Sequence, residues 1–304
     1  MSNISQTYET LRTSKKFQKR FSMITRLIIA LFLIFFSIFP MLWIASASFS
    51  GSQSLSTQSL IPTRPSLANY ERLFGLDPNY RFGDLVYQKW IFNSIKVSGI
   101  STILSLSITT MAAYAFSRLR FKGRVTVLKG ILLINVFPNL LALIAIYVLI
   151  FQFGELIPAI GLNTHAGLIL VYLGGSMGLN IWLMKGFLDT IPRDIDESGM
   201  VDGASHFQIF WNLLLPLLRP ILVVIGVVTF IGTYGDFVLA RILLTDVDKY
   251  TLMVGLQIFT AGQFDQKWGV FAAGALLGAL PIMIIYYVLQ DQIVGGLTQG
   301  AVKG

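Results

Sequence analysis

Residues 189–220 read DTIPRDIDESGMVDGASHFQIFWNLLLPLLRP and form a polar, helix-prone island between two long apolar runs. The island holds five acidic residues within fourteen positions, a third of the fifteen acids in the whole chain. They are Asp189, Asp194, Asp196, Glu197 and Asp202. Because carboxylates are costly to bury without partners, we expect this island to lie in water. The apolar runs on either side of it require a different environment.

The apolar runs are typical of an integral membrane protein. Hydrophobic residues make up 54% of the 304-residue chain, charged residues only 12%, and the mean hydropathy is +0.69. A soluble domain is about one quarter charged. The apolar residues come in blocks of roughly 20, the length that a membrane-spanning helix needs, and they lack the alternation of barrel strands. We therefore predict an all-α polytopic membrane protein.

Six transmembrane helices are expected. They cover about 27–47, 91–116, 131–151, 166–187, 213–234 and 270–289. The first run exceeds the roughly 7 to 15 apolar residues of a cleaved signal peptide, so we interpret it as a span that is retained. Trp90 is expected as an interfacial anchor ahead of the second span, and Pro138 should kink the third. The apolar runs 237–244 and 252–260 are too short to span and are expected as outer-face or re-entrant elements.

The basic residues predict the orientation of the spans. Lys and Arg number 6, 5, 2 and 1 in segments 1–26, 117–129, 185–212 and the tail. They number 4, 0 and 3 in the loops on the other side, 48–89, 152–165 and 235–268. Loops rich in Lys and Arg stay in the cytoplasm. We therefore predict a cytoplasmic segment at 1–26, a six-helix transmembrane domain at 27–292 with the cytoplasmic loop 189–212, and a cytoplasmic tail at 293–304.

Several kinds of site are absent from the sequence. Cysteine does not occur, and the only histidines are His165 and His206, so we expect no metal centre. No G-x-x-x-x-G-K-[ST] stretch occurs, so we expect this chain to bind no cofactor and a partner to bind any ATP and Mg²⁺. The basic residues cluster beside apolar blocks, as topology determinants do, so the net charge of +8 does not predict nucleic-acid binding.

The stretch GGSMG at 174–178 matches the G-x-S-x-G motif of hydrolases. That motif needs a strand before it, a helix after it, and a histidine and an acid within reach. Ser176 instead lies in the middle of an expected span. Glycines spaced G-x-x-x-G, here and again at 274–278, favour close packing of helices. An intramembrane hydrolase that uses Ser176 is therefore a weak alternative.

Within the island, the sequence predicts two capped helices. Pro192 suits a first helical turn, the acids at 194–197 favour a positive helix N-terminus, and Gly203 can adopt a left-handed C-terminal cap. SHFQ at 205–208 fits a capping box that starts the second helix. Pro216 then fixes how the fifth span leaves that helix. The expected product is a short, rigid helix joined at an angle to a membrane span.

The stretch ESGMVDGASHFQIFWNLLLP at 197–216 resembles the EAA motif of permease subunits in bacterial ABC importers. That motif has an acid followed by small residues, then a glycine, then I-x-L-P. The chain departs from it at Leu213, where Ile is usual, and at Ser198 and Gly199, where the family usually has two alanines. Glycine costs about 1 kcal/mol of helix stability against alanine, so we expect this first turn to dock less tightly.

Other stretches resemble the carbohydrate-uptake branch of the same family, of the maltose/maltodextrin type. They are IPTRPSLANYERLF at 61–74, NSI at 93–95, AYAFSRLRFKGR at 113–124, IWLMKGFLDTIP at 181–192, TDVDKYTLMVGLQ at 245–257 and GLTQGAVKG at 296–304. The resemblance extends over about residues 28–304.

The resemblance implies the permease fold of a type I ABC importer and a subunit without catalytic activity. In such an importer an extracytoplasmic binding protein delivers a sugar, two homologous permease subunits form the pathway, and an ATPase dimer grips their cytoplasmic coupling helices. On this chain, 194–210 would be the coupling helix. The residues at the ATPase contact would be Asp194, Glu197, Ser198, Gly199, Asp202, Gly203, Ala204, Leu215 and Pro216. In the tail, Gly300, Val302 and Lys303 would reach the ATPase pair, and 235–268 would face the binding protein.

The resemblance also implies a place in the bacterial cytoplasmic membrane, surrounded by lipid, with both termini in the cytoplasm. It assigns no substrate contacts to this chain, and it favours a malto-oligosaccharide over other sugars only through the tail and the outer loop. The alternative function is a self-contained, ion-coupled sugar carrier. Such carriers usually keep an acid or a histidine near the middle of the membrane, and these spans have no conspicuous one.

Overall fold

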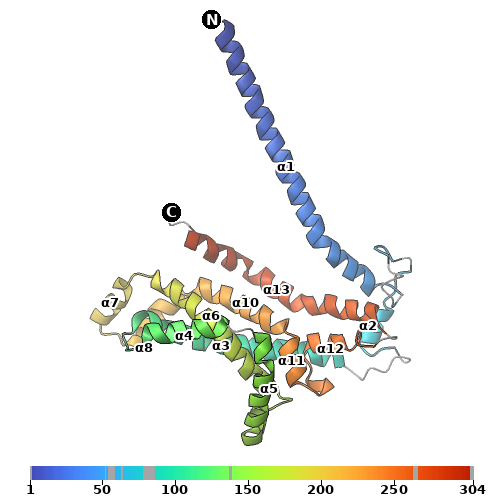
Figure 1. Ribbon diagram of the computed structural model, residues 1–304, viewed down its shortest axis with the longest axis vertical. Helices are drawn as coiled ribbons and strands as arrows, with labels where there is room; N and C mark the ends of the chain where they lie inside the picture. The colour runs from blue at the N-terminus through green and yellow to red at the C-terminus, as the bar shows by residue number, and fades with distance from the viewer. Residues whose placement is uncertain are drawn as a thin grey trace.

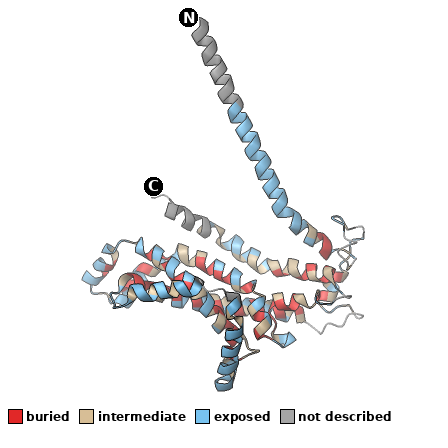
Figure 2. Ribbon diagram, in the orientation of Figure 1, coloured by how far each residue is buried: buried red, intermediate tan, exposed pale blue. Residues whose placement is uncertain are grey.

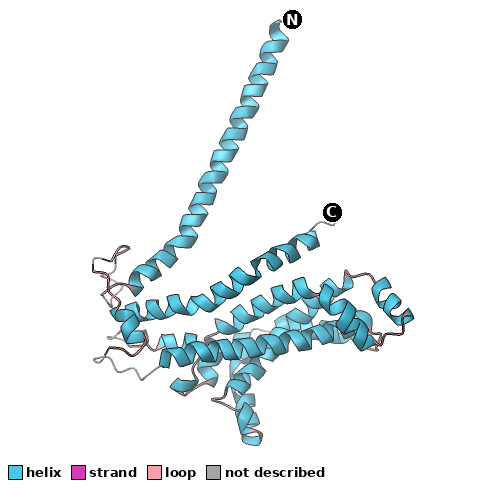
Figure 3. Ribbon diagram, turned by 180° about the vertical axis from the view of Figure 1, so that it is seen from behind, coloured by secondary structure: helices cyan, strands magenta, loops and turns pink. Residues whose placement is uncertain are grey.

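The computed structural model describes residues 2–51, 53, 59–62, 64–77, 86–136, 139–262 and 266–301. For residues 2–17, 136, 139–140 and 293–301 only the backbone is described. Helices make up nearly all of this part of the chain, and it contains no strand beyond an isolated bridge between Ser50 and Pro65 (Figure 3). The predicted all-α fold is confirmed.

The first helix, α1 (Ser2–Ser48), leaves the rest of the molecule and points away from it (Figure 1). Its described side chains are mostly apolar and almost all exposed, for example Phe35 at 65% and Phe36 at 68%. Only its end is covered, where Ala47 and Ser48 are buried and α1 contacts the last helix. A long apolar helix with such exposure needs lipid or another protein around it.

Four helices form the body of the molecule. They are α3 (Val86–Arg118), α6 (His165–Asp189), α10 (Arg219–Tyr234) and α13 (Trp268–Ala301). The helix α3 contacts both α6 and α10, and α10 contacts α13. One side of α3 buries a row of small polar side chains: Ser94, Ser98, Ser101, Ser105 and Thr109. Small residues at this spacing let neighbouring membrane helices approach closely.

The third predicted span is divided. Its first part is α4 (Arg124–Val136), which contacts α6, and its second part is α5 (Asn139–Leu156). In Figure 1, α5 runs across the direction of α4 and stands out from the body. The residue expected to kink this span, Pro138, lies outside the described residues.

The fifth predicted span begins later than expected. The helix that covers His206–Leu217 meets α10 at an angle of 75°, so the continuous span from 213 is wrong. Pro216 and Pro220 flank the bend and account for it, because neither can donate a backbone hydrogen bond. Within the described residues, four helices are long and apolar enough to cross a membrane, or five if this bent pair counts as one.

Short helices form much of the rest of the described chain. They are α2 (Ala68–Leu73), η2 (Pro158–Ile160), α11 (Val238–Leu243), η4 (Val247–Lys249) and α12 (Leu252–Gln257). The apolar runs 237–244 and 252–260 therefore form short elements, as predicted, and not spans.

Two hydrophobic cores hold the molecule together. Figure 2 shows the buried residues in red along the helices of the body. The larger core surrounds Trp90, which is completely buried and joins the start of α3 to the outer helices. The expected role of Trp90 as an interfacial anchor is therefore wrong. The smaller core lies at the opposite end of α3 and contains Met184, Ile209 and Leu214. That second core is the base of the polar island.

Candidate functional site

The polar island begins with a short helix, α7 (Asp194–Val201), whose end is fixed by Gly203. Gly203 has a φ of +80°, its N–H donates to the Met200 carbonyl at 3.0 Å, and the Ala204 N–H donates to the Gly199 carbonyl at 2.9 Å. These two bonds define a Schellman motif, which satisfies carbonyls that a helix end leaves free. The predicted left-handed cap is confirmed.

A second helix starts immediately afterwards, at α8 (His206–Gln208). The Gln208 N–H donates to Ser205 Oγ at 3.3 Å, and the Ser205 N–H donates to Gln208 Oε1 at 2.8 Å. The predicted capping box is therefore present in both directions. The single coupling helix expected over 194–210 is wrong, because the turn at 202–205 divides it in two.

The second helix continues as a π-helix, η3 (Ile209–Leu214), and a short α-helix, α9 (Leu215–Leu217). In the wider turn the Leu215 N–H donates to the Phe210 carbonyl, five residues back. Pro216 has no N–H and could not donate to the preceding turn of a regular α-helix, so the π-helix loses no hydrogen bond at this residue. We call residues 194–217, from α7 through α9, the arm.

The two halves of the arm pack against each other at Gly199. A methyl group at this position would lie 3.0 Å from Ile209 Cγ1 and 3.0 Å from Leu213 Cδ1, tighter than ordinary contact. Gly199 is buried, whereas Ser198 is exposed and donates its hydroxyl to the Asp194 carbonyl at 2.7 Å. The glycine therefore allows α7 to fold closely against η3, and it does not lie on the open surface.

A buried ion pair fastens the arm to α3. Arg118 Nε lies 3.0 Å from Asp196 Oδ2, and the two side chains are only 6% and 7% exposed. Arg118 also donates from Nη2 to the Ile191 carbonyl at 2.9 Å. Because a charge that loses its partner inside a protein is costly, each member of this pair holds the other in place.

A second set of polar contacts holds the link between α6 and the arm. Ser117 Oγ donates to Asp189 Oδ1 at 2.6 Å, and Lys185 forms an ion pair with the same carboxylate. From the other side, Arg193 Nη2 donates to the Ser117 carbonyl at 3.2 Å. The end of α6 and the start of the arm are thus tied to one turn of α3.

An aromatic contact completes the base of the arm. The Tyr114 hydroxyl donates to the His206 carbonyl at 3.3 Å, and the Tyr114 ring centre lies 5.1 Å from that of Phe210. Tyr114, Ser117 and Arg118 are spaced i, i+3 and i+4, so they share one face of α3. Any displacement of the arm must therefore act on α3 as well as on α10.

The outer surface of the arm combines acids with exposed apolar side chains. Val201 is 87% exposed, and Phe207 and Trp211 are stacked with ring centres 6.1 Å apart and are 66% and 53% exposed. Exposed apolar groups beside charges are typical of a surface that contacts another protein.

The site residues expected from the sequence divide into three groups. Exposed ones are Asp194, Glu197, Ser198, Asp202, Gly203 and Pro216; Ala204 and Leu215 are half-buried; and Gly199 is buried. Val302 and Lys303 lie outside the described residues, and only the helical backbone is described for Gly300. The sequence reasoning missed the pair of Arg118 and Asp196, and it placed Phe207 and Trp211 towards the membrane and not among the site residues. Two signals in the sequence could have indicated these residues. One is an arginine, Arg118, in a stretch without acids, and the other is the pair of aromatic residues, Phe207 and Trp211, within the polar island.

The stretch at 174–178 does not form a hydrolase site. Ser176 Oγ lies 3.0 Å from Ser105 Oγ, His165 Nε2 bonds to the Lys249 carbonyl at 2.9 Å, and His206 lies beside Tyr114. Both histidines are thus engaged elsewhere, and α6 supplies no strand before the serine.

The G-x-x-x-G spacings differ in their packing. At Gly274 and Gly278 an added methyl group would lie 2.5 Å and 2.4 Å from leucines of α12, so this pair does form a close helix contact. Of the spaced pair in α6, Gly178 lies against a neighbouring helix, at Asn135 of α4, while Gly174 faces open space.

At the end of α3 away from the arm, its side chains hold the segment 245–257, which we call the outer loop. Asn93 Nδ2 donates to the Asp248 and Tyr250 carbonyls at 2.9 Å and 3.1 Å. The next residue, Ser94, accepts a hydrogen bond at Oγ from the Leu252 N–H at 2.7 Å. One turn earlier, Trp90 Nε1 donates to the Val247 carbonyl at 2.8 Å. The stretches NSI and TDVDKY, more than 150 residues apart, therefore meet in one network.

Asn163 fixes the other side of this loop. It has a φ of 59°, accepts from the Thr245 and Asp246 N–H groups, and donates to the Asp246 carboxylate at 2.6 Å. That hydrogen bond and one from Lys249 hold the pKa of Asp246 below its usual value.

Gly255→Ala should destabilise the outer loop. A methyl group there would lie 2.2 Å from the Trp90 ring, and a buried indole has no room to retreat. Overpacking of this kind costs about 1–3 kcal/mol. We expect a drop of several degrees in thermal unfolding temperature in detergent, whereas Gly99→Ala, where nothing lies within 4 Å, should have little effect. An unchanged unfolding temperature in Gly255→Ala would contradict the packing described for Trp90.

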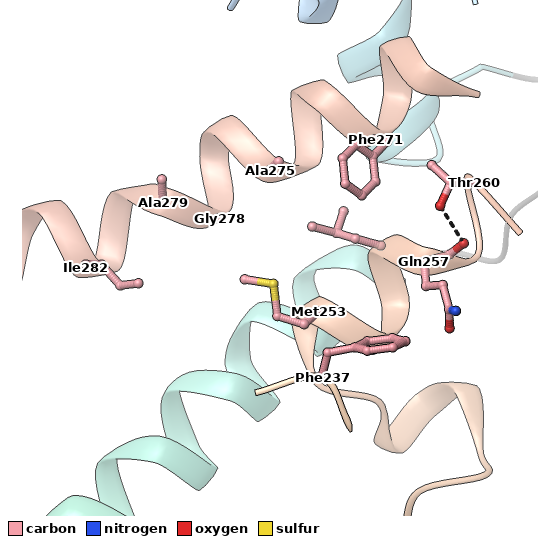
Figure 4. Close-up of a pocket in the computed structure, with 10 residues that line it drawn as sticks. Phe237, Met253, Gln257, Thr260, Phe271, Ala275, Gly278, Ala279 and Ile282 are labelled. Carbon is pink, nitrogen blue, oxygen red and sulfur yellow. Dashed lines mark hydrogen bonds between the residues drawn. The ribbon is translucent and has the colours of Figure 1, made fainter. Parts of the chain in front are cut away.

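A mostly apolar cavity of about 460 Å³ lies next to this loop, between α12 and α13 (Figure 4). Phe237, Met253 and Phe271 line it together with two polar residues, Gln257 and Thr260. Thr260 Oγ1 donates to the Gln257 carbonyl at 3.2 Å. The cavity is therefore formed by the same outer segment that α3 holds in place.

The described part of the chain is thus a helical membrane body with a bent arm fastened to its core. The chain belongs to the family described as binding-protein-dependent transport system inner membrane component, which matches residues 105–299. It is thus a multi-pass permease subunit of the ABC importer class.

Its relatives are maltose/maltodextrin transport system permease proteins MalG. The chain is 44% identical to that of Vibrio vulnificus (strain YJ016) over 272 residues, which cover 88% of this chain and 91% of the relative. It is 41% identical to that of Escherichia coli (strain K12) over 294 residues, which cover 95% and 98%. A bacterial ABC transporter that imports the acidic polysaccharide alginate contains a chain of the same fold. Its TM-score is 0.74 at 22% identity, and the match covers 90% of this chain and 96% of that chain.

Proposed function

We propose that this chain is the permease subunit of an ATP-driven importer of maltose and malto-oligosaccharides in the bacterial cytoplasmic membrane. Relatives of this name are more than 40% identical over most of the chain. The outer-loop stretch 245–257, which carried much of the resemblance, forms a structured element held by Asn93 and Ser94. This supports a shared delivery step at the outer face.

The arm would dock on a partner ATPase and transmit its motion. The observation that carries this proposal is the buried pair of Arg118 and Asp196, which fastens α7 to α3 while the exposed face of α7 remains open to a partner. ATP and Mg²⁺ would be bound and used by that partner, and this chain would be a non-catalytic subunit. The bend of 75° before α10 gives the arm a second connection to the membrane body.

Three further partners complete the proposal. A homologous second permease would supply the other half of the pathway, an extracytoplasmic binding protein would contact 235–268, and lipid or the second permease would cover α1. Both termini would lie in the cytoplasm, on the side of the arm.

Reconstitution tests this function. Vesicles that contain this chain with its second permease and its ATPase should take up labelled maltotriose only when both ATP inside and the binding protein outside are present. Omission of this chain should abolish uptake. If the purified chain alone moves maltotriose down an ion gradient, the importer function fails and a secondary carrier is established. Uptake of other oligosaccharides but not maltotriose would refute the sugar assignment alone.

A further inference from the structure

A basic cavity of about 700 Å³ lies between the end of α3 and the start of α4. It is lined by residues 120–126 and by Arg193, which comes from the link ahead of the arm. Four lining residues are basic: Arg120, Lys122, Arg124 and Arg193. None of the lining residues is acidic. Two segments about 70 residues apart in the sequence therefore build one concentrated positive site.

The positive charge of this cavity is not cancelled by the chain itself. In the described part of the chain, no carboxylate forms an ion pair with any of its four basic side chains. Arg124 donates to the Leu119 carbonyl at 3.3 Å and Arg193 to the Ser117 carbonyl at 3.2 Å, and both acceptors are neutral. Two acids at the base of the arm, Asp189 and Asp196, are paired with Lys185 and Arg118, while Asp194, which follows Arg193 in the sequence, is exposed.

The rim of the cavity is apolar. Phe121 is 43% exposed and its ring centre lies 5.7 Å from that of Phe116, while Val125 is 58% exposed. Both lie where α3 ends and α4 begins, which is the level of the lipid headgroups if these helices enter the membrane. A soluble anion would bind the basic side chains but would leave the apolar rim exposed to water, whereas a lipid would cover both.

We propose that this cavity binds the headgroup of an anionic phospholipid, with the phosphate among the four cations and the acyl chains beside Phe121 and Val125. Basic pockets between membrane helices suit such headgroups. The inference requires only a multi-pass membrane protein, so it does not rest on the proposed sugar or ATPase partner. Through Arg193, the bound lipid would touch the turn of α3 that holds the arm.

Native mass spectrometry of the full chain, purified with its copurifying subunits and supplied with equal phosphatidylglycerol and phosphatidylcholine, tests this site. Arg120→Gln/Lys122→Gln should lower phosphatidylglycerol retention about thirtyfold, because each cation near an anionic lipid contributes about 1 kcal/mol, or roughly fivefold. The matched control, Lys19→Gln/Arg20→Gln, removes the same charge from exposed positions on α1, away from the residues that line the basic cavity. It should retain the lipid. Lys122→Gln alone replaces the double variant if that variant fails to assemble.

Three results would overturn the proposal. Equal loss of phosphatidylglycerol in the variant and the control would show bulk attraction without a site. Displacement of the lipid by inorganic phosphate would identify a soluble-anion site. Retained lipid together with loss of a copurifying subunit in Arg120→Gln/Lys122→Gln would identify a protein-docking surface instead.

Discussion

Arg118→Met should lower ATP-driven sugar uptake at least twentyfold while the protein still inserts into the membrane. Methionine leaves Asp196 buried without a counter-charge, and breaking a buried ion pair in this way costs about 3–5 kcal/mol. That cost is large enough to detach α7 from α3, because local parts of a structure commonly open at such energies. Uptake and ATP hydrolysis, measured in the same reconstituted vesicles, check the prediction: uptake should fall much more than hydrolysis.

A double variant distinguishes the ion pair from a general defect. Arg118→Met/Asp196→Leu replaces both charges by apolar groups, and such replacements are often close to neutral for stability. It should recover most of the lost uptake. Lys129→Met, an exposed position on α4, controls for loss of one positive charge. Uptake in Arg118→Met that matches this control would show that the pair does not hold the arm.

Gly203→Val should lower uptake at least tenfold and leave membrane insertion intact. The residue has a φ of +80°, and a β-branched side chain in this region costs about 1–3 kcal/mol in strain. The strain opposes the two hydrogen bonds that end α7 and redirect the chain into α8. A steric clash does not explain the expected loss of uptake, since nothing lies within 4 Å of a methyl group added at Gly203.

Gly203→Asn is the matched control for that variant. Asparagine tolerates the left-handed conformation far better than valine, and it is larger than glycine. Uptake should remain within a few fold of the unsubstituted protein. If the asparagine and valine variants lose uptake equally, the loss comes from a larger side chain on the exposed surface at position 203 and not from backbone strain at its positive φ.

Local sequence signals predicted the arm well. The cap at Gly203, the capping box at 205–208 and the bend near Pro216 each depend on residues a few positions apart, and the structure has all three. The fold class followed from composition and the length of the apolar runs. These features were predictable because each is decided by the chemistry of a short stretch.

Contacts between distant segments were not predictable in the same way. Trp90 beside an apolar run is typical of an interfacial anchor, yet it is completely buried because Gly255, far away in the sequence, makes room for its ring. The sequence around Gly199 predicted a loosened helix turn, but Gly199 is buried where α7 packs against η3. The pairing of Arg118 with Asp196 likewise needed the three-dimensional arrangement of α3 and α7.

The most direct test of the account asks whether the arm touches the ATPase. The chain contains no cysteine, so Val201→Cys places a single thiol on the most exposed apolar position of the arm, and Leu76→Cys places one at an exposed position outside it. Labelling with a bulky maleimide in open membranes, with and without the ATPase subunit, gives the answer. We predict that the ATPase protects the thiol at position 201 at least tenfold and leaves the one at position 76 unprotected. Equal labelling at position 201 in both conditions would contradict the proposed docking.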